Sequence, residues 1–259
     1  MMIIIVELFS LGGEAGMADF VDFHSHVLPG IDDGSQSVEE SLEMLRAARA
    51  QGVRKLVASP HYYISEGSPD AFIERRNAAV MKLSGLISSD EYPAVYVGAE
   101  VLFSKVIAKT REIQKLTLSG TKYIMIEMPF RCWEADETEA LISLGAVMGL
   151  KPILVHPERY LGYQKRGTAE MLMSRGIILQ YNAEHFIEKK KASRDILCGR
   201  VRLLGSDMHN TSSRPPDLGE LPGVLEKRKI SIRFLEDVYG FSCSLLGNAA
   251  AINPENPNA

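Results

Sequence analysis

Seven short apolar segments, rich in β-branched residues, recur along the chain and are separated by longer amphipathic stretches. Such runs, without clean alternation of apolar and polar residues, are typical of parallel strands covered on both faces. We therefore predict strands at residues 19–24, 54–59, 94–100, 123–127, 152–156, 177–182 and 201–206. The stretches between them predict helices at residues 38–51, 69–87, 105–115, 136–149, 167–176 and 185–198, with a helical end at 217–247.

The helix predicted over 38–51 has the clearest boundaries. Its apolar residues recur at helical spacing, and Ser37 with Glu40 forms a capping box at its start. Gly52 is well placed to end it. This stretch therefore predicts a helix that packs one face on the neighbouring sheet.

Alternation of strands and helices predicts a parallel sheet, either open or closed. In an open sheet, ligands gather at one switch point that a few strands serve. Here nearly every predicted strand ends in a polar residue suited to ligand binding. Only closure brings so many carboxyl ends to one place. We therefore predict an α/β fold of the (β/α)7 barrel type rather than an open sheet.

Size and composition favour one domain. The 259 residues are 46% hydrophobic, enough for one large core, and we see no boundary within residues 17–252. We interpret residues 1–16 as a leader or misassigned start, with an extra strand or partner-binding arm as the alternative. Residues 253–259 predict a frayed, polar tail. The apolar run near the start is too short to cross a bilayer, so membrane insertion is not expected.

Net charge and cysteine content bear on the class of binding partner and on the redox compartment. The net charge of −4, with acids and bases mixed, gives no basic field for nucleic acid. The three cysteines, Cys132, Cys198 and Cys243, are widely spaced and form no CxxC pair. This predicts no disulfide framework and fits a reducing cytoplasm.

The histidines carry the strongest chemical signal. Five of the six lie at or just beyond predicted strand ends, and two acids end similar segments. Imidazole and carboxylate are common ligands of manganese, zinc and iron. The candidate metal ligands, with one aspartate near the last strand, are His24, His26, His61, Glu100, Glu127, His156, Asp207 and His209.

Spacing supports some of these ligands more than others. His24 and His26 alternate on a strand and therefore share a face, and Asp207 with His209 repeats this pattern on the last strand. In a closed barrel the last strand neighbours the first, so the two pairs would lie side by side. His185 lies beyond its strand, and we expect a surface or helix-capping role for it.

The remaining candidates could have structural roles instead of binding metal. Glu100 and Glu127 could instead be capping or salt-bridged glutamates, although an unpaired buried carboxylate is costly and a cation would neutralise it. His61 and His156, beside Pro60 and Pro157, could be satisfied core or loop histidines.

The number of candidates predicts more than one ion. Eight ligands exceed the need of a single cation, so we expect two or three. Ions about 4 Å apart can share a hydroxide and clamp the attacking and leaving oxygens of a phosphoester.

Charged residues beside these ligands indicate a phosphate site. Arg159 and Arg214 follow His156 and His209, and arginine grips phosphate bidentately. Structural salt bridges are the alternative for both. Asp33 on the first loop could assist proton transfer or position the leaving group, whereas Asp32 could only shape the turn with Gly34.

Other phosphate chemistries lack their motifs. No cysteine is followed by arginine six residues later, and there is neither a G-x-S-x-G elbow nor a Walker A loop. Attack by metal-activated water is therefore the simplest mechanism.

The motifs DFHSHVLPGIDDGS, ASPHYY, VGAEV, IMIEMP, LVHPERY and GSDMHN, followed by Arg214, resemble the polymerase-and-histidinol-phosphatase (PHP) superfamily. They most resemble its bacterial manganese-dependent tyrosine-protein phosphatases of capsular and exopolysaccharide loci. The resemblance runs from about Asp19 to Arg214 and onward towards Ile252. ASPHY replaces the more usual ATPHY, and the leader before Met17 also departs from the pattern.

The resemblance implies a distorted (β/α)7 barrel with a trinuclear site made by the eight ligands. It implies Mn²⁺, with Fe²⁺, Zn²⁺ or Mg²⁺ as alternatives, and catalytic or phosphate-binding roles for Asp33, Arg159 and Arg214. The implied reaction is hydrolysis of phosphotyrosine by a metal-bridging hydroxide. The implied partner is the phosphotyrosine tail of a bacterial tyrosine autokinase that controls polysaccharide export.

Aromatic residues near the ligands could contact that substrate. Tyr62 and Trp133, with Tyr63 and Phe130, could line the phosphotyrosine entrance, and packing at the rim is the alternative.

Other functions remain open from the sequence. A histidinol-phosphate or other small-molecule phosphatase would use the same scaffold, and a non-catalytic, metal-stabilised phosphotyrosine-binding module is an alternative of another class. The acidic charge disfavours a nuclease role. The cognate kinase and the oligomeric state are not encoded in any motif.

Overall fold

The computed structural model describes residues 19–87, 90–247 and 249–252. The expected leader at 1–16 and the expected tail at 253–259 lie outside these residues. Among the described residues, no helix is both long and apolar enough to cross a membrane.

Every pairing between the strands is parallel. One sheet has the order β1-β2-β4 and the other the order β3-β5-β6-β7-β8-β9. The strands are β1 (Phe20–Ser25), β2 (Val53–Ala58), β3 (His61–Tyr62), β4 (Ala94–Val97), β5 (Glu100–Leu102), β6 (Tyr123–Glu127), β7 (Lys151–Val155), β8 (Ile178–Asn182) and β9 (Leu203–Gly205).

The strand predicted at 94–100 is interrupted, and a short further strand follows the one predicted at 54–59, which explains the two sheets. β2 and β3 are separated by Ser59 and Pro60, and β4 and β5 by Gly98 and Ala99. Backbone bonds continue across the interruption, from Gly98 N to Ala58 O at 2.8 Å and from Glu100 N to Pro60 O at 3.0 Å. Pro60 lacks an N–H group, so the ladder must break there. The seven predicted strands are confirmed as seven strand paths.

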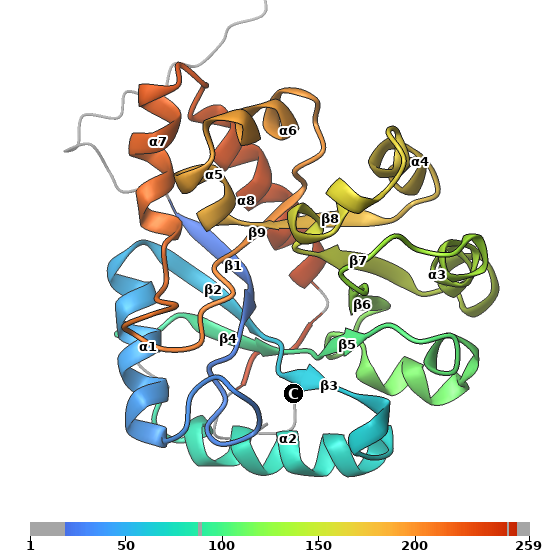
Figure 1. Ribbon diagram of the computed structural model, residues 1–259. Helices are drawn as coiled ribbons and strands as arrows, with labels where there is room; N and C mark the ends of the chain where they lie inside the picture. The colour runs from blue at the N-terminus through green and yellow to red at the C-terminus, as the bar shows by residue number, and fades with distance from the viewer. Residues whose placement is uncertain (1–18, 88–89, 248, 253–259) are drawn as a thin grey trace, which may run out of the picture.

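The barrel closes where the last strand meets the first. Asp207 N donates to His24 O at 2.8 Å, and His26 N donates to Met208 O at 2.9 Å. Ser25 and Met208 form an isolated parallel bridge. Figure 1 shows β9 beside β1 in the resulting ring of strands. The predicted (β/α)7-type barrel is therefore confirmed, with the distortion that two broken strands introduce.

Helices follow most strands, as predicted. They are α1 (Val38–Ala50), α2 (Pro69–Ser84), α3 (Ala135–Met148), α4 (Thr168–Ser174), α5 (Ala183–Glu188), α6 (Ser193–Leu197), α7 (Leu221–Lys227) and α8 (Arg233–Leu246). Half of the predicted capping box forms, because the Ser37 side chain accepts from Glu40 N while the Glu40 carboxylate accepts from Gln36 N instead of Ser37 N. Short 3₁₀ turns fill the connections: η1 (Ile64–Glu66), η2 (Ile107–Lys109), η3 (Arg111–Leu116), η4 (Pro157–Arg159), η5 (Leu161–Tyr163), η6 (Lys190–Ala192) and η7 (Leu218–Glu220).

Two predicted helices were wrong in detail. The stretch 105–115 forms the 3₁₀ turns η2 and η3, which extended Thr110 separates. The stretch 185–198 breaks at Lys189, whose backbone is extended, into α5, η6 and α6. Three consecutive lysines provide no apolar residue to continue the buried stripe there, so the helix has no packing to sustain it.

A bulge in β1 separates core packing from the candidate site. The four residues from Asp22 to Ser25 lie opposite the three from Leu56 to Ala58 on β2. One extra residue changes which face the following side chains occupy. Phe23 therefore packs in an apolar cluster with residues of β2, β4, β6, β7 and β9, while His24 lies among the candidate ligands.

Candidate metal centre

All eight predicted ligands lie together at the carboxyl ends of the strands, where Asp33 joins them. Four groups have donor atoms that lie within 4.8 Å of one another, the spacing that a cation needs. They are His26, Asp33, His61 and His209; His24, Glu100 and His156; His24, His26 and Asp207; and His61, Glu100 and Glu127. Shared members connect the groups, so the arrangement could hold several ions in one continuous site.

Glu100, which begins β5, lies at the centre of the cluster. Its Oε2 is 3.1 Å from His24 Nε2, 3.3 Å from His26 Nε2 and 3.1 Å from His61 Nδ1. Its Oε1 is 2.7 Å from His156 Nε2. One fully buried carboxylate therefore faces four imidazoles, the geometry expected of a ligand shared between ions.

The backbone is strained at two of the candidate ligands. The described non-glycine residues with positive φ are His156 at 32°, Asp207 at 54° and Lys229 at 58°. Left-handed backbone is unfavourable for residues with a side chain and persists where the surrounding structure enforces it. Two of these three residues lie at the candidate centre, which marks it as a functional site rather than ordinary packing.

Two ring nitrogens test whether cations fit. His61 Nδ1 and His209 Nε2 are buried and make no hydrogen bond, although carboxylate oxygens of Glu100 and Asp33 lie 3.1 Å and 3.3 Å away. Burial, and then the neighbouring His26, lowers the pKa of His209 to about 4, which keeps its imidazole in the neutral, ligating form. Burial, and then Glu100, raises the pKa of Glu127 to about 7. A cation would coordinate these nitrogens and offset the charge of the neighbouring carboxylates, so the donor set fits bound metal.

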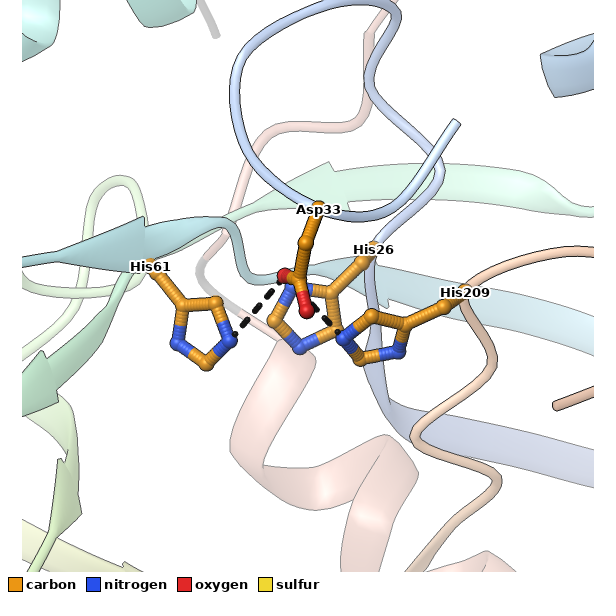
Figure 2. A group of neighbouring side chains, drawn as sticks. All are labelled: His26, Asp33, His61 and His209. Carbon is orange, nitrogen blue, oxygen red and sulfur yellow. Dashed lines mark ion pairs between the residues drawn. The ribbon is translucent and has the colours of Figure 1, made fainter. Parts of the chain in front are cut away.

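Asp33 points into the cluster from the loop after β1 (Figure 2). Its Oδ1 lies 3.4 Å from His61 Nε2 and 3.3 Å from His209 Nε2, while 65% of the side chain remains exposed. A carboxylate that is both exposed and close to ligands can contact a cation and an incoming substrate.

Asp32 holds two of the candidate ligands in place, a role that the sequence did not predict. Its Oδ1 accepts from Gly34 N at 3.0 Å, which confirms that it shapes the turn. Its Oδ2 also accepts from His26 Nδ1 at 2.7 Å and from His61 N at 3.0 Å. Asp32 thereby orients one ligand ring and anchors the backbone of another. Histidine ligands commonly need such partners, and that general rule was the available signal.

Gln180 and Asn182 on β8 were also missed. Gln180 Oε1 accepts from His24 Nδ1 at 3.0 Å, and Gln180 Nε2 donates to Asn182 Oδ1 at 3.1 Å. Asn182 Nδ2 in turn donates to Asp207 Oδ2 at 3.0 Å. This chain links ligands on the first and last strands. The signal was two polar residues at alternate positions inside an otherwise apolar strand.

Arg159 and Arg214 converge on one carboxylate. Arg159 Nη2 and Arg214 Nη2 both donate to Asp207 Oδ2, the latter at 2.8 Å. The other oxygen of Asp207 lies 3.6 Å from His24 Nε2 and 3.4 Å from His26 Nε2. The salt bridges considered as an alternative therefore exist. Each guanidinium remains more than a third exposed and keeps further donors for an anion.

The aromatic residues are arranged differently from the expectation. Tyr62 is 2% exposed and donates its hydroxyl to Gly67 O, and Trp133 is 8% exposed and donates Nε1 to Pro129 O. Such burial disagrees with direct substrate contact by either ring. Tyr63 instead stacks on His61 with ring centroids 5.3 Å apart, and Phe130 lies 6.1 Å from the ring of His156.

His185 and the three cysteines, which were not expected to bind metal, are not among the grouped candidate ligands. His185 on α5 faces Asp195, with 3.3 Å between Nε2 and Oδ2, and stacks on Tyr181. Cys132, Cys198 and Cys243 are all free thiols. Neither set belongs to the candidate centre.

Fold and site together define a parallel βα barrel with a cluster of histidines and carboxylates that could hold metal ions, and with two arginines beside it. The chain belongs to the CpsB/CapC family, described as capsular polysaccharide synthesis, whose sequence profile matches residues 20–237. The predicted family resemblance is thereby confirmed.

Individual relatives agree with this assignment. Tyrosine-protein phosphatase YwqE of Bacillus subtilis is 31% identical over 222 residues, which cover 80% of this chain and 84% of that protein. Tyrosine-protein phosphatase CpsB of Streptococcus agalactiae serotype V is 29% identical over 213 residues, covering 77% of this chain and 87% of that protein.

A solved structure is similar over nearly the whole fold. It comes from the crystal structures of YwqE from Bacillus subtilis and CpsB from Streptococcus pneumoniae, described as unique metal-dependent tyrosine phosphatases. The TM-score is 0.72 at 26% identity, covering 91% of this chain and 99% of that chain.

Proposed function

We propose that this protein is a metal-dependent protein-tyrosine phosphatase, a hydrolase of phosphoric monoesters. The observation that carries the proposal is the position of Asp207 between His24 and His26 on one side and Arg159 and Arg214 on the other. A phosphoryl group placed at this junction would meet cations and guanidinium groups together, as charge stabilisation in phosphate hydrolysis requires. The tyrosine phosphatases among its relatives support phosphotyrosine as the substrate.

Three side chains would take part in the hydrolysis directly. Arg159 and Arg214 bind the nonbridging phosphoryl oxygens and orient the phosphorus centre. Asp33, which is largely exposed beside His61 and His209, receives or relays a proton near the leaving oxygen. Bound divalent cations would supply Lewis acidity and activate water for attack. We propose the eight ligands as their holders, because imidazole and carboxylate donors without thiolate suit Mn²⁺, Fe²⁺ or Zn²⁺. Among these ions we propose Mn²⁺, which the family resemblance implies.

We also propose a partner and a cellular location. We propose that the substrate is the phosphotyrosine tail of a bacterial tyrosine autokinase, since the family is described as acting in capsular polysaccharide synthesis. Free thiols at all three cysteines support a reducing, cytoplasmic setting.

A substrate panel tests the proposal. Protein stripped with a chelator and then given Mn²⁺ should release phosphate from a phosphotyrosyl peptide, and the stripped protein should not. Faster turnover of histidinol phosphate would reassign it as a small-molecule phosphatase. Binding of the peptide without release of phosphate, with Mn²⁺ present, would indicate a non-catalytic module.

The metal assignment has a readout that does not depend on activity. Binding of Mn²⁺ to the folded state should raise the melting temperature of the stripped protein with increasing ion concentration. The His26→Ala variant should lose this shift, because it removes a ligand from two of the four groups. An undiminished shift in that variant would contradict the assignment.

A further inference from the structure

A hollow of about 480 Å³ adjoins the candidate centre and has no assigned role. Its walls come from three consecutive connections at the carboxyl ends of the strands. Phe130 follows β6, Arg159 and Tyr163 follow β7, and Glu184 with Glu188 lies on α5 after β8. Figure 1 shows α5 leaving the end of β8 on this side of the barrel. Arg159 also contacts Asp207, so the hollow borders the proposed phosphate site.

The exposure of the aromatic walls distinguishes this hollow from ordinary surface. Phe130 is 51% exposed and Tyr163 is 57% exposed. Among the described residues, these are the only aromatic side chains in the set of exposed large hydrophobic residues, and both line this hollow. Exposed aromatic surface beside a catalytic arginine is typical of a site that binds a ligand.

The remaining walls are polar, formed by Glu158, His185 and Lys189 together with Glu184 and Glu188. The last two suit the backbone of a peptide. Glu184 and Glu188 are four residues apart on α5, so both carboxylates lie on one helix face. Carboxylates accept hydrogen bonds and could receive the N–H groups of an extended chain. The ring of Phe130 is 6.1 Å from that of His156, and an extended peptide advances about 3.3 Å per residue. A side chain one or two residues from the phosphotyrosine would therefore reach the hollow.

We propose that this hollow is a subsite for the peptide that flanks the phosphotyrosine, with Phe130 and Tyr163 packing on a bulky apolar side chain one or two positions away. The inference rests on the proposed function. The subsite would add a preference for the peptide sequence around the phosphotyrosine. The metal centre cannot supply this preference, because metal ions and arginines contact only the phosphoryl group. A small aryl phosphate would fill the metal centre and leave the hollow empty.

Steady-state kinetics with three substrates test the subsite. They are a phosphotyrosyl peptide with leucine at the flanking positions, the same peptide with glycine there, and p-nitrophenyl phosphate. Tyr163→Ala should raise KM for the leucine peptide roughly fivefold or more with little change in kcat, as loss of an aromatic anchor does. Constants for the glycine peptide and for p-nitrophenyl phosphate should not change.

Matched variants separate this role from damage to the fold. Tyr163→Phe keeps the ring and should behave as the parent. Met81→Ala removes a side chain that is 61% exposed on α2, which contributes no residue to the hollow, and should leave all three substrates unaffected. An equal rise in KM for both peptides, or no rise for either, would overturn the subsite. Failure of the parent protein to hydrolyse any phosphotyrosine substrate would instead remove the proposed function and the subsite with it.

Discussion

His24 Nδ1 donates a hydrogen bond of 3.0 Å to Gln180 Oε1, and both side chains are fully buried. An amide oxygen can only accept, so Nδ1 of His24 carries a proton, and Nε2, which faces Glu100 and Asp207, is the nitrogen left to bind a cation. A residue on β8 thereby fixes which nitrogen of a β1 histidine is available to a cation.

Replacing Gln180 should therefore weaken metal binding without contact to the metal. We expect Gln180→Leu, which leaves the Nδ1–H group of His24 unpaired, to lower Mn²⁺ affinity about 10- to 100-fold. Calorimetric titration of the stripped protein would measure this. Gln180→Glu keeps an acceptor for His24 and should lie closer to the parent. Unchanged affinity in the leucine variant would show that the hydrogen bond plays no part in orienting the ligand.

Arg214→Ala should reduce catalysis more than stability. The guanidinium is partly exposed, and Asp207 keeps Arg159 and Asn182 as partners when Arg214 is removed. We expect kcat/KM on a phosphotyrosyl peptide to fall roughly 100-fold, as for loss of one group that stabilises transition-state charge.

The matched control for this change is Arg166→Ala, an exposed arginine in the loop before α4. It should alter neither kinetics nor melting temperature. A normal rate with a lowered melting temperature in Arg214→Ala would favour a purely structural salt bridge.

Gly205 permits the close contact of β9 with β1 and β8. A Cβ atom there would lie 2.6 Å from His24 Cβ, 2.8 Å from Gln180 Nε2 and 2.9 Å from His24 N. Because all three atoms belong to His24 and Gln180, which are fixed in the cluster, Gly205→Ala should destabilise the protein by about 1–3 kcal/mol and weaken metal binding. Urea denaturation and Mn²⁺ titration would measure the two effects.

A second glycine provides the control. A Cβ at Gly240 within α8 meets no atom within 4 Å. Gly240→Ala should stabilise the helix by roughly 0.5–1 kcal/mol. Equal and small effects from the two substitutions would refute the steric argument for Gly205.

Asp217 predicts a pH dependence of stability. Burial, and then the charges of Asp22, Glu184 and Glu220, raises its pKa from 3.8 to about 8. The folded state thus binds this proton more tightly than the unfolded state, so raising the pH from about 4 to about 8 costs stability. Asp217→Asn removes the cost, and its melting temperature should exceed that of the parent most at pH 8.

The melting curves should be compared in chelator-treated protein, so that cation binding does not contribute. The difference between variant and parent should shrink steadily as the pH is lowered towards 4. A difference that is independent of pH would mean that Asp217 has an ordinary pKa in the folded protein.

Much of the fold followed from local pattern. The seven apolar segments predicted the strands, because residues buried on both faces of a parallel sheet must be apolar throughout. The capping box at Ser37 predicted a helix start for the same kind of local reason. The single helix predicted over 185–198 was wrong, because its apolar periodicity does not reveal that Lys189 to Lys191 have no surface to pack against.

The sequence by itself determined which side chains could serve as ligands, because polar residues that end buried strands must gather at one rim once those strands are parallel. Only the tertiary structure decided their partners: the central place of Glu100 among four histidines, the chain from His24 through Gln180 and Asn182 to Asp207, and the burial of Tyr62 and Trp133. These features depend on distances between strands far apart in the chain and on the extra residue in β1. No local pattern encodes them, because side-chain partners across a barrel are set by register and packing.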